Sequence, residues 1–294
     1  MIGNGHRETP GVASRHWHMR YAGHLGLRAP DSPLFQHSAD SIAAADQIRF
    51  LADLGFAGVQ DNFLELRSPA EQKVIGAQIA RLGLEMGSFT GNPQYWNRPL
   101  WNATDAASRS TLRKGLDASI DAARRVNGRV IGCVTGVMAS TPRDRQVAAM
   151  IDNLKLMAEP AARGGIVLCV EAVAAQWIPG LLVRTIGEAA HIVRAVDSPA
   201  VRLMFDVGHV QMSDGRVLAH LENCWSHIGA IQVADAPGRI DLGAGELHWP
   251  TILRTIRNRG WSGLIEIEHM PVEETAAGER RLIERLRAID AALS

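Results

Sequence analysis

The chain has 294 residues, 46% of which are hydrophobic, and its formal net charge is zero. This length fits one eight-stranded α/β barrel of about 250 residues with extensions. A neutral chain lacks the basic face that nucleic-acid binding usually requires, so we expect a small-molecule partner and no nucleic acid.

The cysteines and the apolar runs indicate a cytoplasmic protein. Cys133, Cys169 and Cys224 are isolated in the sequence, which is typical of buried thiols in a reducing compartment. The N-terminal stretch has no apolar core of a signal peptide, and no apolar run reaches the roughly 18 residues of a membrane span. We therefore expect a cytoplasmic location and no membrane association, and a homo-oligomer stays open.

Residues 1–18 are polar and contain Gly and Pro, which favours an irregular N-terminal arm. From residue 19 onward, apolar runs alternate with segments of helical periodicity. The predicted strands lie within 20–27, 56–60, 84–89, 129–136, 166–173, 201–209, 228–235 and 263–270. The predicted helices are 41–55, 68–83, 104–127 with Thr104 as N-cap, 143–165, 185–198, a short one near 214–222, 251–260 and about 273–293. An aromatic loop, 90–102, interrupts the alternation.

This alternation predicts parallel strands that are joined by helical crossovers. Eight such units favour closure into a (β/α)8 TIM barrel over an open sheet. We therefore predict one α/β domain over residues 19–294.

Four polar residues stand at the ends of four successive apolar strands: Glu171, Asp206, Gln232 and Glu268. Their spacing is about one strand–helix unit, so a parallel barrel would bring their oxygens to one rim, where such barrels place active sites. Taken singly, each carboxylate could pair with an arginine, and Gln232 could be a satisfied core amide. Three carboxylates at one rim would repel one another without a cation. Oxygen ligands favour Mn²⁺ or Mg²⁺ over structural zinc.

Four further residues are candidates for substrate binding. His209 follows Asp206 in DVGH, and Arg239 lies in DAPGR after the seventh strand. Glu246 lies in the turn GAGE, and Trp96 lies in the aromatic loop. Each has an alternative interpretation without a role in the site. His209 could be a histidine without a special role and Arg239 a surface arginine. Glu246 could lie in a solvated turn, and Trp96 could pack against the end of the barrel.

Three segments carry a family resemblance: MFDVGHVQMSDG, HIGAIQVADAPGRIDLGAGELHW and GWSGLIEIEHMP. They resemble the hydroxypyruvate isomerase branch of the xylose isomerase-like barrel superfamily. The resemblance implies that Glu171, Asp206, Gln232 and Glu268 are the metal ligands, and that Glu171 and Glu268 are the acid–base pair. Gln232 and DAPGR indicate this branch, because other branches usually carry histidine in place of the glutamine.

The sequence also departs from that pattern around the expected substrate. An asparagine and an arginine that follow the first glutamate in the family are missing here, and further positions differ as well. The residues at these positions are Ala174, Ala175, Gln176, Gly132, Gln60, His269 and Met270. The proton-transfer residues are kept while the substrate-contacting residues change. The sequence therefore supports isomerisation as the reaction more strongly than it supports a small anionic keto acid as the substrate.

These observations predict a metal-dependent isomerase of the aldose–ketose type, acting on hydroxypyruvate or a related small hydroxy-carbonyl compound. The cation would acidify a C–H bond as a Lewis acid, and one of the two glutamates would remove the proton while the other returns one through an enediolate. His209 and Arg239 would stabilise the oxygen of that intermediate. The alternatives are a ketose 3-epimerase or sugar-modifying lyase on the same metal site, and a non-catalytic sugar-binding barrel. DNA repair fits the neutral charge poorly.

Overall fold

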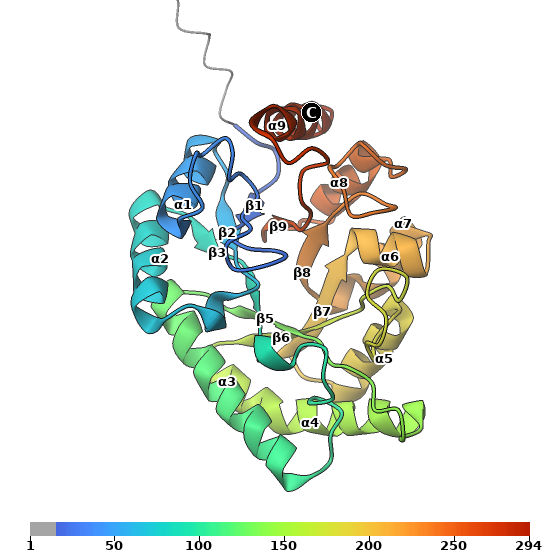
Figure 1. The fold of residues 1–294 in the computed structure, drawn as a ribbon. Helices are drawn as coiled ribbons and strands as arrows, with labels where there is room; N and C mark the ends of the chain where they lie inside the picture. Colours follow the sequence, from blue (N-terminus) through green and yellow to red (C-terminus); the bar gives the residue numbers. More distant parts are fainter. Residues whose placement is uncertain (1–15) are drawn as a thin grey trace, which may run out of the picture.

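Parallel strands follow one another around a closed barrel in the computed structural model, which describes residues 16–294 (Figure 1). Neighbouring strands pair in the order β3-β2-β1-β9-β8-β7-β6-β5-β4. The strands are β1 (Tyr21–His24), β2 (Gly58–Gln60), β3 (Glu85–Met86), β4 (Ser88–Thr90), β5 (Val130–Cys133), β6 (Val167–Glu171), β7 (Val201–Asp206), β8 (Ile228–Val233) and β9 (Ile265–Ile267). The predicted α/β barrel is confirmed.

Strands β3 and β4 together occupy one position in the barrel and close it. β3 pairs with β2 and β4 pairs with β5, with only Gly87 between them. A Cβ atom on Gly87 would lie 2.5 Å from Glu266 Oε1, so the close approach of this carboxyl requires glycine. The predicted strand 84–89 is therefore one barrel strand with a local break, which gives eight strand positions.

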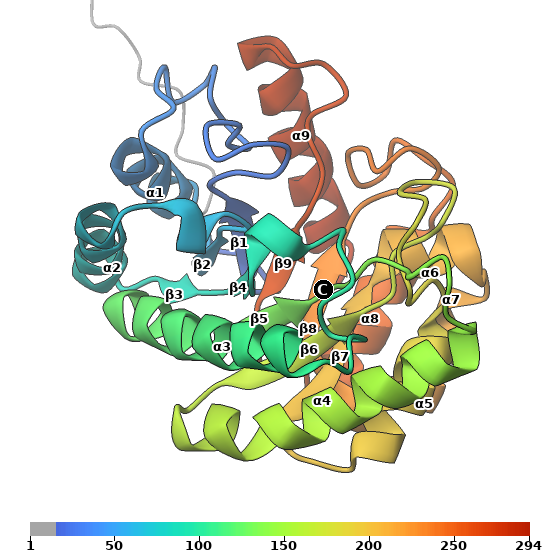
Figure 2. The same ribbon diagram turned by 60° about the horizontal axis from the view of Figure 1, so that its bottom comes forward.

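The α-helices surround the strands, as Figures 1 and 2 show from two directions. They are α1 (Ala44–Asp53), α2 (Pro69–Leu82), α3 (Ala106–Val126), α4 (Arg143–Arg163), α5 (Ile186–Val196), α6 (Val207–Ser213), α7 (Val217–Cys224), α8 (Trp249–Asn258) and α9 (Ala276–Ala291). Short 3₁₀ helices are η1 (Leu64–Leu66), η2 (Pro93–Tyr95) and η3 (Trp225–His227).

Two helix predictions are corrected. The N-cap of α3 is Asp105, whose carboxylate accepts a hydrogen bond from Ser108 N at 2.8 Å, and not Thr104. The predicted short helix near 214–222 is α7, and the additional short helix α6 begins directly after β7, within the predicted strand 201–209. Asp206 caps α6 by accepting a hydrogen bond from His209 N at 2.8 Å, which ties the end of the strand to the start of the helix.

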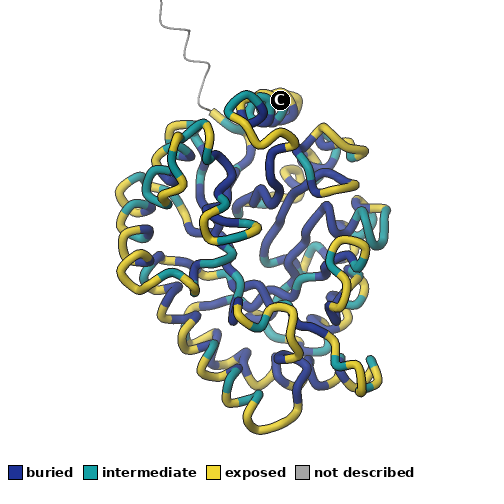
Figure 3. Tube along the Cα trace, in the orientation of Figure 1, coloured by how far each residue is buried: buried dark blue, intermediate teal, exposed yellow. Residues whose placement is uncertain are grey.

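The core lies between the strands and the inner faces of the helices, and Figure 3 shows the buried strands inside a partly exposed outer layer. Helix α8 illustrates the pattern, since Trp249, Ile252, Leu253 and Ile256 are buried at helical spacing. This packing gives the ends of the strands a rigid frame from which the connecting loops project.

The predicted arm falls largely on residues 1–15, which lie outside the described residues. Within the described part, Trp17 Nε1 donates to Leu54 O at 2.9 Å and His18 N donates to Asp290 Oδ2 at 2.7 Å. Residues 17 and 18 thus contact the C-terminal end of α1 and helix α9. The three cysteines are buried and free, as predicted, and no described helix is long and apolar enough to cross a membrane.

Candidate active site at the carboxyl end of the barrel

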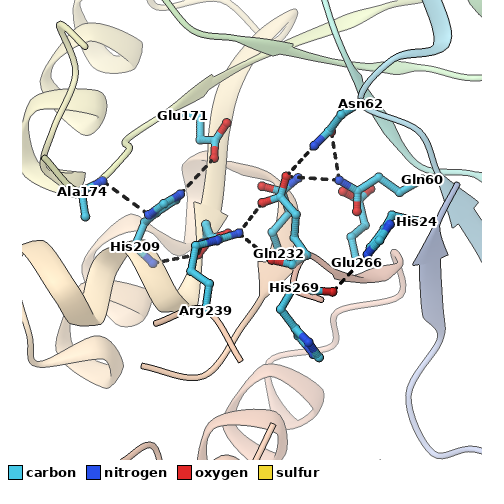
Figure 4. Close-up of polar contacts among 12 residues, drawn as sticks. His24, Gln60, Asn62, Glu171, Ala174, His209, Gln232, Arg239, Glu266 and His269 are labelled. Carbon is cyan, nitrogen blue, oxygen red and sulfur yellow. Dashed lines mark hydrogen bonds and ion pairs between the residues drawn. The ribbon is translucent and has the colours of Figure 1, made fainter. Parts of the chain in front are cut away.

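The four strand-end residues meet at one end of the barrel, where Figure 4 labels Glu171 and Gln232. Glu171 is the last residue of β6, Asp206 the last of β7, and Glu268 directly follows β9. Gln232 in β8 pairs in register with Asp206 in β7. The strand register thus gathers three carboxyl groups and one amide, as the spacing predicted.

Arg239 lies inside this cluster. Its guanidinium donates to both carboxylate oxygens of Asp206 at 2.9 Å each and to Glu268 Oε2 at 2.6 Å, and it also donates to Glu268 O at 2.8 Å. All three side chains are less than one-tenth exposed. The arginine therefore pairs with two of the four predicted metal ligands, a contact that the sequence did not reveal.

The loop after β8 holds Arg239 in place through Asp235. The buried carboxylate of Asp235 accepts hydrogen bonds from Gly243 N and Trp249 Nε1 at 2.8 Å and from Gly245 N and Leu247 N at 3.1 Å. Arg239 itself adopts a left-handed backbone with φ of 48°, which is uncommon for a residue with a side chain. Such a conformation needs support from its surroundings, and the contacts of Asp235 supply it.

The carboxyl group of Glu171 has no hydrogen-bond partner among the described residues, and the ring of His209 lies close to it. Glu171 Oε1 lies 3.8 Å from His209 Nε2. His209 Nδ1 accepts a hydrogen bond from Ala174 N at 3.4 Å, so a neutral His209 carries its proton on Nε2. His209 therefore presents an N–H donor toward Glu171, which fits its predicted role as a hydrogen-bond donor to substrate better than a role as metal ligand.

The opposite carboxyl, Glu268, is held by amides. Glu268 Oε1 accepts hydrogen bonds from Asn62 Nδ2 at 2.9 Å and from Gln60 Nε2 at 3.4 Å, while Oε2 accepts from Arg239. Asn62 and Gln60 stand at the end of β2 and lie more than 200 residues away from Glu268 in sequence. One glutamate of the pair is thus fixed by several donors and the other is free.

The environment separates the acidities of the three carboxyl groups. Burial and the charges of Glu268 and Asp206 raise the pKa of Glu171 well above its ordinary value. Burial raises the pKa of Glu268 to about 7, against the opposing charge of Arg239. Burial alone would also raise the pKa of Asp206, but the charge of Arg239 and the hydrogen bonds that Arg239 and His209 N donate to Asp206 outweigh it and lower that pKa.

Glu266 is a buried carboxyl that the sequence reading missed. Ser88 N donates to Glu266 Oε1 at 2.7 Å and Ser88 Oγ donates to Oε2 at 2.5 Å. Gln232 Nε2 in turn donates to Ser88 Oγ at 3.4 Å. The alternation of side chains along a strand could have revealed Glu266. Residues two apart in a strand share a face, and Glu266 stands two residues before Glu268 in IEIE.

The donor set at this rim fits a divalent cation with oxygen ligands. Because Gln232 Nε2 points to Ser88, its Oε1 is left buried and without a partner. Glu171 is also free to coordinate, and carboxylate oxygens of Glu171 and Asp206 lie within 4.8 Å of each other. Carboxylate and amide oxygens suit Mg²⁺ or Mn²⁺, and the charge of Arg239 offsets only part of the three carboxylates.

A pocket of about 450 Å³ opens above the cluster, and Glu171, His209, Arg239 and Glu268 form its polar floor. Trp96, at the end of η2, also lines this pocket. Glu246 is exposed, accepts a hydrogen bond from Gln211 Nε2 at 3.0 Å and is not among the lining residues. The structure thus brings the predicted substrate-binding residues together except for Glu246.

A closed parallel barrel with acidic residues at the carboxyl ends of its strands matches one family along most of the chain. The sequence model of the xylose isomerase-like TIM barrel family matches residues 48–289. The chain belongs to this family. The resemblance seen in the sequence is confirmed, and the match includes all the candidate residues of the site.

Relatives with assigned names narrow the family to isomerases. The chain is 25% identical to the 2-oxo-tetronate isomerase of Pectobacterium atrosepticum, over 88% of this chain and 95% of that protein. It is 27% identical to the hydroxypyruvate isomerase of Escherichia coli, over 58% of this chain and 66% of that protein. The prediction of an isomerase is thus confirmed, and these relatives speak against a non-catalytic barrel.

Solved structures show how widely this fold is shared. A crystal structure named AP endonuclease, family 2, from Brucella melitensis has a TM-score of 0.75 at 22% identity, over 88% of this chain and 96% of that chain. A D-psicose 3-epimerase has a TM-score of 0.72 at 17% identity, over 93% of this chain and 97% of that chain. At these identities the likeness establishes the fold alone.

Proposed function

We propose that the chain interconverts an aldehyde and a ketone by moving a proton between adjacent carbons of hydroxypyruvate or a related small hydroxy-carbonyl compound. The observation that carries the proposal is the pair Glu171 and Glu268, which line the same pocket in different environments. Glu171 has no hydrogen-bond partner among the described residues, whereas Glu268 is held by Asn62, Gln60 and Arg239. Two carboxyl groups with separated environments are typical of an acid–base pair.

In this reaction one glutamate removes the proton from the carbon that bears the hydroxyl group, and the other returns a proton to the neighbouring carbon. The intermediate is an enediolate, in which negative charge develops on oxygen. His209 Nε2–H and the guanidinium of Arg239 lie at the pocket floor, where they can donate hydrogen bonds to that oxygen. Donors that are already fixed in place stabilise such charge without reorganising during the reaction.

Glu171, Asp206, Gln232 and Glu268 would hold a divalent cation, Mn²⁺ or Mg²⁺. When bound, this cation supplies Lewis acidity that polarises the substrate carbonyl. The unpartnered oxygen of Gln232 and the unbonded carboxyl of Glu171 support the assignment. Arg239 keeps Asp206 and Glu268 oriented toward the same site.

Replacing each glutamate tests the proposal. Glu171→Gln and Glu268→Gln should each lower kcat by at least about 100-fold, as removal of a general acid or base does, while the circular dichroism spectrum stays unchanged. The exposed Glu159→Gln on α4 is the matched control and should keep full activity. If both site variants turn over hydroxypyruvate, or any other hydroxy-carbonyl compound that the wild type isomerises, at the wild-type rate, the two-glutamate scheme is wrong.

Solvent deuterium separates isomerisation from epimerisation. Isomerisation in deuterium oxide should place the label on the carbons that exchange aldehyde and ketone character. Label at C3 of a ketose, with the carbonyl unchanged, would instead identify a 3-epimerase.

A further inference from the structure

The active-site pocket has an extensive apolar wall beside its polar floor. One wall is the connection between β6 and α5, which contributes Val173, Trp177, Ile178 and Leu181. No lining residue from this connection carries a charge. A wall of this kind offers contact area and no hydrogen bonds, so it fits an apolar group.

The facing walls combine apolar and polar residues, the polar ones being Arg28, Asn62, Thr90 and His269. Leu27 after β1, Phe63 after β2 and Met270 after β9 line the pocket, and Val134 follows β5. These four apolar residues come from different connections around the rim. A substrate whose reacting atoms reach Glu171 and Glu268 therefore meets apolar side chains on more than one side of the pocket, most densely on the wall that carries Trp177 and Ile178.

Two tryptophans extend the apolar surface into solvent. Trp96 and Trp177 line the pocket, yet 36% and 45% of their respective surfaces remain exposed. Large aromatic side chains at the mouth of a pocket are typical of sites that bind an apolar or aromatic group. The exposure of both rings is accounted for if such a group covers them.

The charges at the floor leave no cation for a substrate carboxylate. Glu171, Asp206 and Glu268 face a single guanidinium, that of Arg239, which already binds two of them. A bound divalent cation would bring this cluster to neutrality and not beyond it. The other cation among the lining residues, Arg28, is 63% exposed and pairs with Glu274 at 2.6 Å.

The size of the pocket also exceeds the needs of a three-carbon acid. Its volume of about 450 Å³ falls within the range of sites that bind drug-sized ligands, roughly 300–1,000 Å³. A small acid would leave the apolar walls in contact with water.

From these observations we propose that the preferred substrate is an uncharged hydroxy-carbonyl compound whose remote end carries an apolar or aromatic substituent. This inference rests on the proposed function and names its substrate class. The hydroxy-carbonyl end reaches Glu171 and Glu268, and the substituent packs between Trp96, Trp177 and the apolar walls. The reaction is a balanced isomerisation, R–CHOH–CHO to R–CO–CH₂OH, in which only protons and the carbonyl position move.

The test is a series of substrates that differ only in R. The hydroxyketones are hydroxypyruvate with R a carboxylate, dihydroxyacetone with R a hydroxymethyl group, and 1-hydroxy-3-phenylpropan-2-one with R a benzyl group. We expect kcat/KM for the benzyl compound to exceed that for each of the others by about 10-fold or more, since even one methylene in an apolar pocket contributes about that factor. A higher kcat/KM for hydroxypyruvate would overturn the inference and leave the isomerase proposal standing.

Variants locate the effect in the pocket walls. Trp177→Ala should lower kcat/KM for the benzyl compound about 10-fold more than for dihydroxyacetone, because the lost contact is made by the substituent. Ile178→Arg should supply a cation for the carboxylate of hydroxypyruvate, so kcat/KM for hydroxypyruvate should then exceed that for the benzyl compound. Leu156→Ala, at an exposed apolar residue on α4, is the control and should leave the order unchanged. An unchanged order in both wall variants would contradict the inference.

Binding measurements separate the two proposals. If no compound of the series is isomerised, the proposed function fails, and calorimetry on the wild-type protein still decides the substrate class. The benzyl hydroxyketone should then bind with a Kd at least about 10-fold lower than that of hydroxypyruvate. Equal or weaker binding of the benzyl compound would overturn the inference.

Discussion

Replacing Arg239 with methionine should destabilise the folded protein strongly, because it leaves two buried carboxylates without their cation. The guanidinium makes three charged hydrogen bonds to Asp206 and Glu268 at 2.6–2.9 Å, and each such bond contributes about 1.5–3 kcal/mol. Protonation of Glu268, whose pKa is about 7, relieves part of the loss. We therefore expect Arg239→Met to lower the free energy of unfolding by about 3–5 kcal/mol at pH 7, the usual result of breaking a buried ion pair.

The assay is urea unfolding followed by circular dichroism, with Arg163→Met as the control. Arg163 pairs with Glu159 on the exposed face of α4, so its loss should cost less than about 1 kcal/mol. The cost of Arg239→Met should shrink between pH 7 and pH 5, because the folded variant takes up protons on the freed carboxyls and the unfolded chain does not. A loss below 1 kcal/mol for Arg239→Met, or a loss that grows toward pH 5, would refute the reasoning.

Four further predictions concern the surroundings of the site. Burial raises the pKa of Glu266 to about 7, so its contribution to stability is present below pH 4.5 and is lost as the pH rises through 7. In urea titrations, Glu266→Gln should therefore reduce the change in the free energy of unfolding between pH 5 and 8 by about 3 kcal/mol. An unaltered pH dependence of that free energy would count against this. Gly87→Ala should cost about 1–3 kcal/mol in the same assay, because its Cβ would lie 2.5 Å from Glu266 Oε1, and a neutral result would show that the carboxyl can move away. Asp235→Ala should destabilise the protein by at least about 3 kcal/mol and lower kcat, since it releases the loop that places Arg239; unchanged kinetics would contradict that coupling. Treatment with a chelator should abolish isomerisation and Mn²⁺ or Mg²⁺ should restore it, whereas full activity in metal-free protein would argue against the proposed ligands.

The sequence alone predicted the fold and the positions of the candidate ligands. Alternating apolar runs and helical periodicities depend on near neighbours in the chain, so they are readable without a structure. In a parallel barrel all strands end at the same rim, so polar residues such as Glu171 and Asp206 at strand ends had to converge. Local errors occurred at helix ends, as at α3, where the N-cap is Asp105 and not Thr104. The short helix α6, which begins within the predicted strand 201–209, was also missed.

The same local signals could not reveal which side chains contact one another at the rim. Arg239 bridges Asp206 and Glu268, which lie 33 and 29 residues away in sequence. Asn62 and Gln60 reach Glu268 across more than 200 residues. Such pairs depend on barrel closure and on loop conformation, neither of which leaves a periodic trace in the sequence.

The sequence by itself determined the barrel and the four strand-end oxygens, because strand and helix patterning is local and parallel strands share one rim. Only the tertiary structure decided how those oxygens are used: Glu171 free beside His209, and Glu268 and Asp206 bound to a buried arginine. It also decided that apolar side chains such as Trp177 and Ile178 form one wall of the pocket. The physical reason is that charge pairing and pocket shape arise from distances between residues far apart in the chain, which folding sets and sequence spacing does not encode.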